Sequence, residues 1–307
     1  MQDSRKKYLE FFKKIIKEDF SGSFLIYGER GIGKNDFCKQ IISQIFQTEN
    51  YKNHPDYYEI KKAKDKKIIL IQDIREVLLK LNLASHQGGY KIIYVRDADK
   101  MLPESANVLL KNIEEPGKKT IFLLSTNKIK SILPTIKSRC VKIYLGPLSK
   151  KTILKKLSEK INNENLIKKL AAFSLGKIDR INKIKNESDF EMQEKFVKNV
   201  FKYFFNADLV SCFLFSSEFN KKGIKFRNAL NTILIILRDL LLMKNNNYKN
   251  ISFIFLEKDY QKILEKFPEQ KILELSKQIL DYKRIIKYNI SEKLILENIC
   301  FENYKNE

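Results

Sequence analysis

The sequence predicts an α/β domain built on a parallel sheet with a phosphate-binding loop, followed by a small helical domain and an all-helical C-terminal domain. Short buried apolar strands alternate with helical patterns up to about residue 145, which is typical of a parallel sheet covered on both faces. A glycine-rich loop directly follows the first strand, and the strand signals stop after Gly146-Pro147. We therefore expect domains at residues 1–146, 147–189 and 190–307.

The first elements surround the glycine-rich loop. Apolar residues at helical spacing predict a helix over about residues 5–17, and Phe24 to Tyr27 form a short buried strand. After the loop, Phe37, Ile41, Ile42 and Ile45 predict a second helix. Strand, glycine loop and helix in this order are the context that a phosphate-binding loop requires.

The later elements continue the alternation. They are an extended stretch leading to Ile60, a helix over 71–83, a turn at Gln87-Gly88-Gly89, a strand over 90–95, a helix from Pro103 that Pro116 stops, and strands over 120–124 and 141–145. From residue 148 to about 186 the pattern indicates a small helical module. From about residue 190 to the end it is again helical.

Composition excludes several classes of protein. With 307 residues, 43% hydrophobic and 31% charged, the chain has the composition of a soluble globular protein. The apolar stretch from Thr232 to Met243 is broken by Arg238-Asp239 and is too short to span a bilayer. The first residues show neither an apolar core nor a small-residue cleavage site, so export is not expected. We therefore expect a cytoplasmic protein without a membrane partner.

Cysteine and histidine usage argues against a metal site. The four cysteines are scattered and there are only two histidines, so the sequence shows no zinc-ligand spacing and implies no disulfide framework. We expect no bound metal and no zinc.

The chain is strongly basic. Its net charge is 59 − 37 = +22, which favours a polyanionic partner such as nucleic acid. Lysine is also overused along the whole chain, so a general compositional bias explains the charge equally well. Both interpretations stay open.

The phosphate-binding loop is Gly28-Glu29-Arg30-Gly31-Ile32-Gly33-Lys34-Asn35, a degenerate Walker A motif. Gly28, Gly31, Gly33 and Lys34 are the residues that would cradle phosphate oxygens. Asn35 stands where Ser or Thr normally offers a hydroxyl to magnesium. We expect weak or vestigial ATP or ADP binding. The alternative is an inherited turn that binds nothing.

A second damaged motif, Arg96-Asp97-Ala98-Asp99, follows the strand over 90–95. Asp97 is in the position of the acid that positions magnesium, but Ala98 replaces the acid that would orient the attacking water. Loss of such an acid removes roughly 10²–10⁴-fold in rate. Asp99 is expected to face the other side of a strand. Intrinsic ATP hydrolysis is therefore not expected.

Several further runs, in order and spacing, resemble the clamp-loader branch of the AAA+ ATPases, and most closely its delta-prime subunits of bacterial DNA polymerase III. The resemblance covers roughly residues 20–145. The runs are His54-Pro55-Asp56, Gly88 to Lys91 through Asp99 to Met101, Ala106 to Lys111, Glu114-Glu115-Pro116, and Leu133 to Ile136 with Ser138-Arg139-Cys140. The resemblance implies that the helical remainder forms the family's lid and collar domains.

The resemblance also implies roles for single residues. Arg139 matches the trans-acting arginine finger that reaches the nucleotide of a neighbouring subunit, although taken alone it would be a surface salt bridge. Asn127 aligns with the polar sensor of the gamma phosphate, or simply ends a strand. Asp179 matches the place of the lid's sensor arginine, with Arg180 one step away. His54-Pro55-Asp56 is interpreted as a turn and Cys140 as a small buried residue.

For function, the resemblance implies a non-hydrolysing, stator-like subunit that requires no cofactor. It would join gamma/tau-like motor subunits and a delta subunit in a hetero-oligomer and would help to load the sliding clamp onto primed DNA. The alternative is an ATP-hydrolysing motor subunit with divergent motifs. A third possibility is the clamp-opening delta subunit.

Overall fold

The computed structural model describes residues 4–63, 65–81, 85–86, 89–159, 161–182, 184, 186–205, 208, 210, 213, 226–285 and 291–304. The chain forms two compact units, residues 1–153 with 176–179 and residues 154–175 with 180–307. The predicted turn at Gln87-Gly88 and the last residues of the helix predicted over 71–83 lie outside the described residues. The division into three domains at residues 146 and 189 stays a prediction.

The first unit contains a sheet of five parallel strands in the order β2-β3-β4-β1-β5. The strands are β1 Gly22–Tyr27, β2 Tyr57–Ile60, β3 Lys91–Val95, β4 Thr120–Thr126 and β5 Val141–Tyr144. The predicted parallel sheet is therefore confirmed, and the extended stretch before Ile60 is its edge strand β2. Strand β4 runs two residues farther than predicted, because Ser125 and Thr126 pair with Ile26 and Tyr27 of β1.

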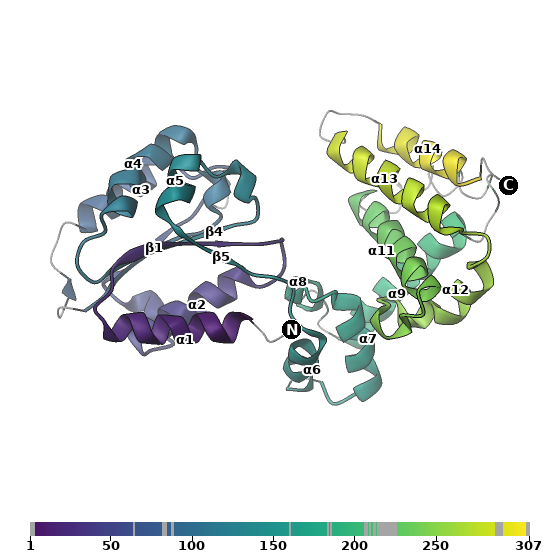
Figure 1. The fold of residues 1–307 in the computed structure, drawn as a ribbon, viewed down its shortest axis with the longest axis horizontal. Coiled ribbons are helices and arrows are strands. Elements are labelled where there is room, and N and C mark those ends of the chain that lie inside the picture. Colours follow the sequence, from purple (N-terminus) through teal and green to yellow (C-terminus); the bar gives the residue numbers. More distant parts are fainter. Residues whose placement is uncertain are drawn as a thin grey trace. The chain divides into compact units, whose positions relative to one another are not determined.

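Helices cover both faces of this sheet (Figure 1). One face carries α1 Ser4–Lys17 and α2 Lys34–Phe46, and the other carries α3 Ile71–Leu81, α4 Pro103–Glu114 and α5 Pro134–Arg139. In the first layer Phe12 of α1 packs against Phe24 of β1 with ring centroids 4.8 Å apart. Burying an apolar side chain of this size contributes about 1.5–3 kcal/mol, so packing on both faces stabilises the sheet from which the loops project.

The second unit is all-helical, as predicted for the C-terminal part. Its helices are α7 Glu164–Ser174, α9 Glu187–Phe205, α11 Phe226–Lys244, α12 Glu257–Ile263, α13 Glu269–Ile285 and α14 Glu292–Tyr304. Helix α11 packs against α9 and α13, and α13 packs against α14. The short helices α6 Lys150–Ser158 and α8 Ile178–Ile181 lie where the chain passes between the units.

Two features of the described residues bear on the sequence predictions. No described helix has the length and apolar character needed to cross a membrane. Cys38 and Cys140 are free, but Cys300 is disulfide-bonded. The expectation of no disulfide was therefore wrong, because the spacing of cysteines along a chain does not reveal which of them meet in the fold.

Candidate functional site

The sheet order brings the sequence-predicted nucleotide residues to one edge. The loop Gly28 to Asn35 follows β1, Asp97 follows β3, and Asn127 follows β4. Strands β3, β4 and β1 are adjacent and parallel, so their carboxyl ends meet at the same edge, where open α/β sheets bind their ligands. The structure thus joins three segments that are far apart in the sequence.

The loop depends on its glycines. Gly28 has φ of 155°, and a Cβ built there would lie 2.2 Å from the carbonyl oxygen of Leu145. Gly33 has φ of 85° and caps the N-terminus of α2. These conformations favour glycine, so the loop predicted from the sequence has the backbone that the motif demands.

Two outside segments hold the loop. The Arg5 guanidinium in α1 donates hydrogen bonds to the carbonyl oxygens of Ile32 at 2.6 Å and Gly146 at 3.2 Å. The backbone N–H of Asp179 donates to the carbonyl oxygen of Gly31 at 3.1 Å. Lys177 forms an ion pair with Glu29. No role for Arg5 or Lys177 was predicted from the sequence, because their loop partners are distant in the chain.

Lys34 is buried and hydrogen-bonded to other groups of the protein. Its ammonium donates to the carbonyl oxygens of Gly28 at 2.9 Å and Glu29 at 2.6 Å, and to Oδ1 of Asn127 at 2.7 Å. Burial lowers the pKa of Lys34, opposed first by the charge of Asp97. An ammonium has three N–H donors, and all three have an acceptor here. A phosphate would have to displace one of them.

Asn127, Asp97 and Asp99 form one network at the end of β4. The Asn127 amide donates to Oδ1 of Asp97 at 3.1 Å. Oδ1 of Asp99 accepts from the Thr126 hydroxyl at 2.8 Å and from the backbone N–H of Asn127 at 3.3 Å. The expectation that Asp99 faces the other side of a strand was wrong. Strand β3 ends at Val95, and the short helix Ala98–Lys100 turns Asp99 toward β4.

Asn35 binds Arg96, a residue to which the sequence assigned no role. In the amide orientation that satisfies both neighbours, Asn35 donates to the Tyr94 hydroxyl at 2.8 Å. Its oxygen then accepts from Nε and Nη2 of Arg96 at 3.0 and 3.1 Å. Nε of Arg96 also lies 3.9 Å from Oδ2 of Asp97. One guanidinium therefore lies against both positions that hold magnesium in a working loop, and these side chains do not fit a magnesium ion. Among the described residues, no group of three or more His, Cys, Asp or Glu side chains is arranged to hold a metal ion.

The two lid residues behave differently. Asp179 lies against the loop, and a Cβ on Gly31 would be 3.3 Å from the Cβ of Asp179. Arg180 donates to the carbonyl oxygen of Phe173 at 3.0 Å, and its guanidinium lies 5.5 Å from the centre of that ring. An acid thus lies where the resemblance implies a sensor arginine.

Arg139 is the last residue of α5 and its side chain is one-third exposed. Nε donates to Oε2 of Glu114 at 2.6 Å, and Nη1 donates to the carbonyl oxygen of Thr135 at 3.3 Å. The ion pair expected for an isolated surface arginine is therefore present. No hydrogen bond or ion pair of Nη2 is found among the described residues, so this nitrogen is available to a further acceptor.

The two minor sequence predictions are confirmed. Cys140 is buried and free, and burial raises the pKa of its thiol to about 12, which keeps it unreactive. Nδ1 of His54 accepts from the backbone N–H of Asp56 at 3.2 Å, and its ring stacks on Phe46 with centroids 3.9 Å apart. His54-Pro55-Asp56 is a turn before β2.

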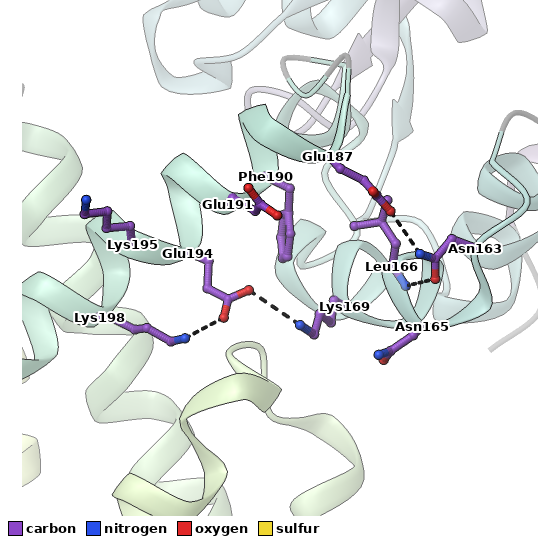
Figure 2. A pocket seen from close by; sticks show the side chains of 10 residues that line it. All are labelled: Asn163, Asn165, Leu166, Lys169, Glu187, Phe190, Glu191, Glu194, Lys195 and Lys198. Carbon is purple, nitrogen blue, oxygen red and sulfur yellow. Dashed lines mark hydrogen bonds and ion pairs between the residues drawn. The ribbon is translucent and has the colours of Figure 1, made fainter.

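The second unit contains a groove of about 520 Å³ between α7 and α9 (Figure 2). Its polar groups largely bind one another. Glu194 pairs with Lys169 at 3.6 Å and with Lys198 at 2.7 Å, and Asn163 donates to Glu187 at 2.9 Å. Because the charges are mutually neutralised, the groove does not point to a ligand of a particular chemistry.

Comparison with known proteins extends the resemblance beyond the loop. Residues 4–149 match the family model described as DNA polymerase III, delta subunit. The chain is 25% identical to "DNA polymerase III subunit delta'" of Bacillus subtilis over 94% of this chain and 92% of that protein. It is 42% identical to the Escherichia coli protein of the same name, over 31% of this chain and 28% of that protein.

A solved structure supports the fold alone. A DNA polymerase III gamma subunit-related protein of Thermotoga maritima aligns with a TM-score of 0.50 and 21% identity, over 97% of this chain and 98% of that chain. The chain is thus similar to the DNA polymerase III delta' subunits over most of its length, and residues 4–149 match the family model for the delta subunit of DNA polymerase III.

Proposed function

We propose that this chain is a non-hydrolysing, stator-like subunit of a replicative clamp loader that contributes Arg139 to the ATP site of a neighbouring subunit. The observation that carries the proposal is the contrast between the two sites. In its own loop, Lys34 is hydrogen-bonded to protein acceptors, and Asn35 binds Arg96 in a way that does not suit a magnesium ion. Arg139, in contrast, lies at the surface, and its Nη2 is not used in its bond to Glu114.

The first half of the proposal concerns its own ATP chemistry. ATP hydrolysis needs a magnesium ion and a residue that orients water, but Asn35 and Ala98 stand at those positions. Lys34 would also have to leave one of its three protein acceptors before it could bind a phosphate. The chain therefore requires no nucleotide cofactor, and any ATP or ADP in the loop is weakly held by Gly28, Gly31, Gly33 and Lys34.

The second half concerns Arg139. A guanidinium is always charged and its planar fork suits phosphate oxygens. Fingers of this kind contribute about 10³–10⁵ in rate in related nucleotide hydrolases. Arg139 ends a short helix that begins at Pro134 and is anchored by the buried Ile136. Its side chain stays one-third exposed.

The partners follow from the family. We propose gamma/tau-like motor subunits and a delta subunit as neighbours in a hetero-oligomer in the cytoplasm. Through them the chain would act on the sliding clamp and primed DNA. Similarity to delta' subunits over most of the chain supports this assembly, and the net charge of +22 is compatible with DNA nearby.

The test is reconstitution with the motor subunits of the same cell. Wild type and Arg139→Ala should assemble equally well. The DNA- and clamp-stimulated ATPase rate of the assembly with the variant should be lower, by the amount that one ATP site contributes. Arg30→Ala, which removes an exposed arginine from the chain's own loop, is the control. An unchanged rate for Arg139→Ala would refute the finger role.

The alternative, a motor subunit with divergent motifs, is tested by the chain alone. The proposed function predicts no magnesium-dependent ATP turnover by the purified chain. Turnover that Lys34→Ala abolishes would establish the alternative instead.

A further inference from the structure

Arg96 lies between the two side chains that would share a divalent cation in a working phosphate-binding loop. Its Nε and Nη2 donate to the oxygen of Asn35 at 3.0 and 3.1 Å, and Nε lies 3.9 Å from Oδ2 of Asp97. Asn35 is the second residue of α2 and Asp97 follows β3, so the contact joins two motifs separated by about sixty residues.

The surroundings fix this arrangement. The Asn35 amide nitrogen is bound to the Tyr94 hydroxyl at 2.8 Å. Tyr94 is buried, its hydroxyl lies 3.3 Å from Oγ of Ser125, and burial raises its pKa far above the usual range. Oγ of Ser125 accepts in turn from the backbone N–H of Asp97 at 3.3 Å. A chain of hydrogen bonds thus holds the Asn35 oxygen toward Arg96.

This geometry disfavours a divalent cation for two reasons. Magnesium needs oxygen ligands at about 2.0–2.1 Å in a near-octahedral shell, but the Asn35 oxygen already accepts two hydrogen bonds. A doubly charged ion would also lie within a few ångströms of the guanidinium charge, which arginine cannot lose. Asp97 already has two cations close to it, since Lys34 and Arg96 both lie nearby.

We propose that Arg96 takes the place of the divalent cation and excludes magnesium from this loop. Arg96 is thus a specificity-determining residue that prevents the chain from binding a magnesium–nucleotide complex. This inference deepens the non-hydrolysing half of the proposed function and is independent of Arg139. It also goes beyond the loss of a hydroxyl at Asn35, because it predicts that restoring this hydroxyl alone is not enough.

The experiment compares full-length Asn35→Thr, Arg96→Ser and the double variant with wild type. Fluorescent ATP is titrated in magnesium and in EDTA, and manganese binding is followed by electron paramagnetic resonance. Arg75→Ser, which removes an exposed arginine from α3 in the same unit, is the matched control. Thermal unfolding checks that each variant is folded, and Asn35→Thr/Arg96→Met replaces the double variant if serine prevents folding.

The double variant should bind fluorescent ATP at least tenfold more tightly in magnesium than in EDTA and should bind manganese. Wild type, Asn35→Thr and Arg75→Ser should show less than a twofold effect of magnesium. Equal magnesium dependence in Asn35→Thr and in the double variant would overturn the proposal, as would magnesium-dependent binding by wild type or none by the folded double variant. Failure here leaves the reconstitution result for Arg139→Ala unaffected, so the two proposals fail separately.

Discussion

Oε2 of Glu114 accepts a hydrogen bond from Nε of Arg139 at 2.6 Å, on the edge of the guanidinium that faces back to α4. The carbonyl oxygen of Thr135 accepts from Nη1 at 3.3 Å. These two contacts restrict the rotation of the side chain, and they leave Nη2 without a hydrogen bond among the described residues. Carboxylates that orient a functional group from behind act similarly at metal sites.

We therefore predict that Glu114→Ala weakens the proposed action of Arg139 on a neighbouring ATP site without abolishing it. In the reconstituted assembly, kcat for stimulated ATP hydrolysis should fall about 5–10-fold at the affected site with little change in KM, because a loose guanidinium spends less time in place. Folding stability should change by less than about 1 kcal/mol, since the pair is exposed.

The controls for this prediction separate orientation from charge. Glu114→Gln keeps an acceptor oxygen and should retain most of the rate, and Glu115→Ala removes the exposed neighbouring acid. In an Arg139→Ala background, Glu114→Ala should add nothing, because the two residues act as a unit. An additive loss would show that Glu114 acts elsewhere.

The phosphate-binding loop gives a second prediction. Gly28→Ala should destabilise the first unit by about 3 kcal/mol or more, because its Cβ would lie 2.2 Å from a backbone oxygen at φ of 155°. Gly117→Ala is the matched control, since the nearest atom to its Cβ is 3.6 Å away. Denaturant unfolding measures both variants. Equal stabilities would contradict the strained geometry of the loop.

The sequence predicted the elements of the first unit well, because the spacing of apolar residues and the positions of glycine and proline are local signals. Pro103 begins α4 and Pro116 follows its end, as the pattern required. The spacing of the glycines, together with the apolar strand before them, located the phosphate-binding loop. The contacts that define the site were not predictable in this way. Arg96 binds Asn35, and Asp179 lies on Gly31, but neither pair has a spacing that a periodic pattern encodes.

The error at Asp99 has a similar origin. Alternation of side chains holds only while the strand continues, and β3 ends at Val95. The residues that follow turn into a short helix, with Asp97 in the left-handed region at φ of 53°. The same turn aims both Asp97 and Asp99 at β4. A sequence signal for this existed in the polar run after Val95, which is too charged to continue a buried strand.

The second unit contains a buried acid, Asp239, which in the sequence is only a break in an apolar stretch. Oδ2 of Asp239 accepts from the backbone N–H groups of Ser252 and Phe253 at 2.8 and 2.9 Å, and from the Tyr260 hydroxyl at 3.4 Å. Asp239→Ala should lower the free energy of unfolding by about 3–5 kcal/mol, because it leaves these buried donors and Arg238 without their partner. Asp259→Ala, on the exposed surface of α12, should change it by less than about 1 kcal/mol in the same denaturant assay.

Asp239 also predicts a pH dependence of stability. Burial raises the pKa of this carboxyl from 3.8 to about 6, against the opposing effect of its hydrogen bonds. The folded state therefore holds the proton more tightly than the unfolded state, so this group's contribution is complete below about pH 4 and is lost as the pH rises through about 6. At 1.36 kcal/mol for each unit of pKa, the loss of unfolding free energy is about 2–3 kcal/mol.

The measurement is the difference in unfolding free energy between wild type and Asp239→Asn, whose side chain cannot titrate, from pH 4 to pH 7. A difference that stays constant, or that favours wild type more as the pH rises, would show that the hydrogen bonds outweigh burial at this carboxyl.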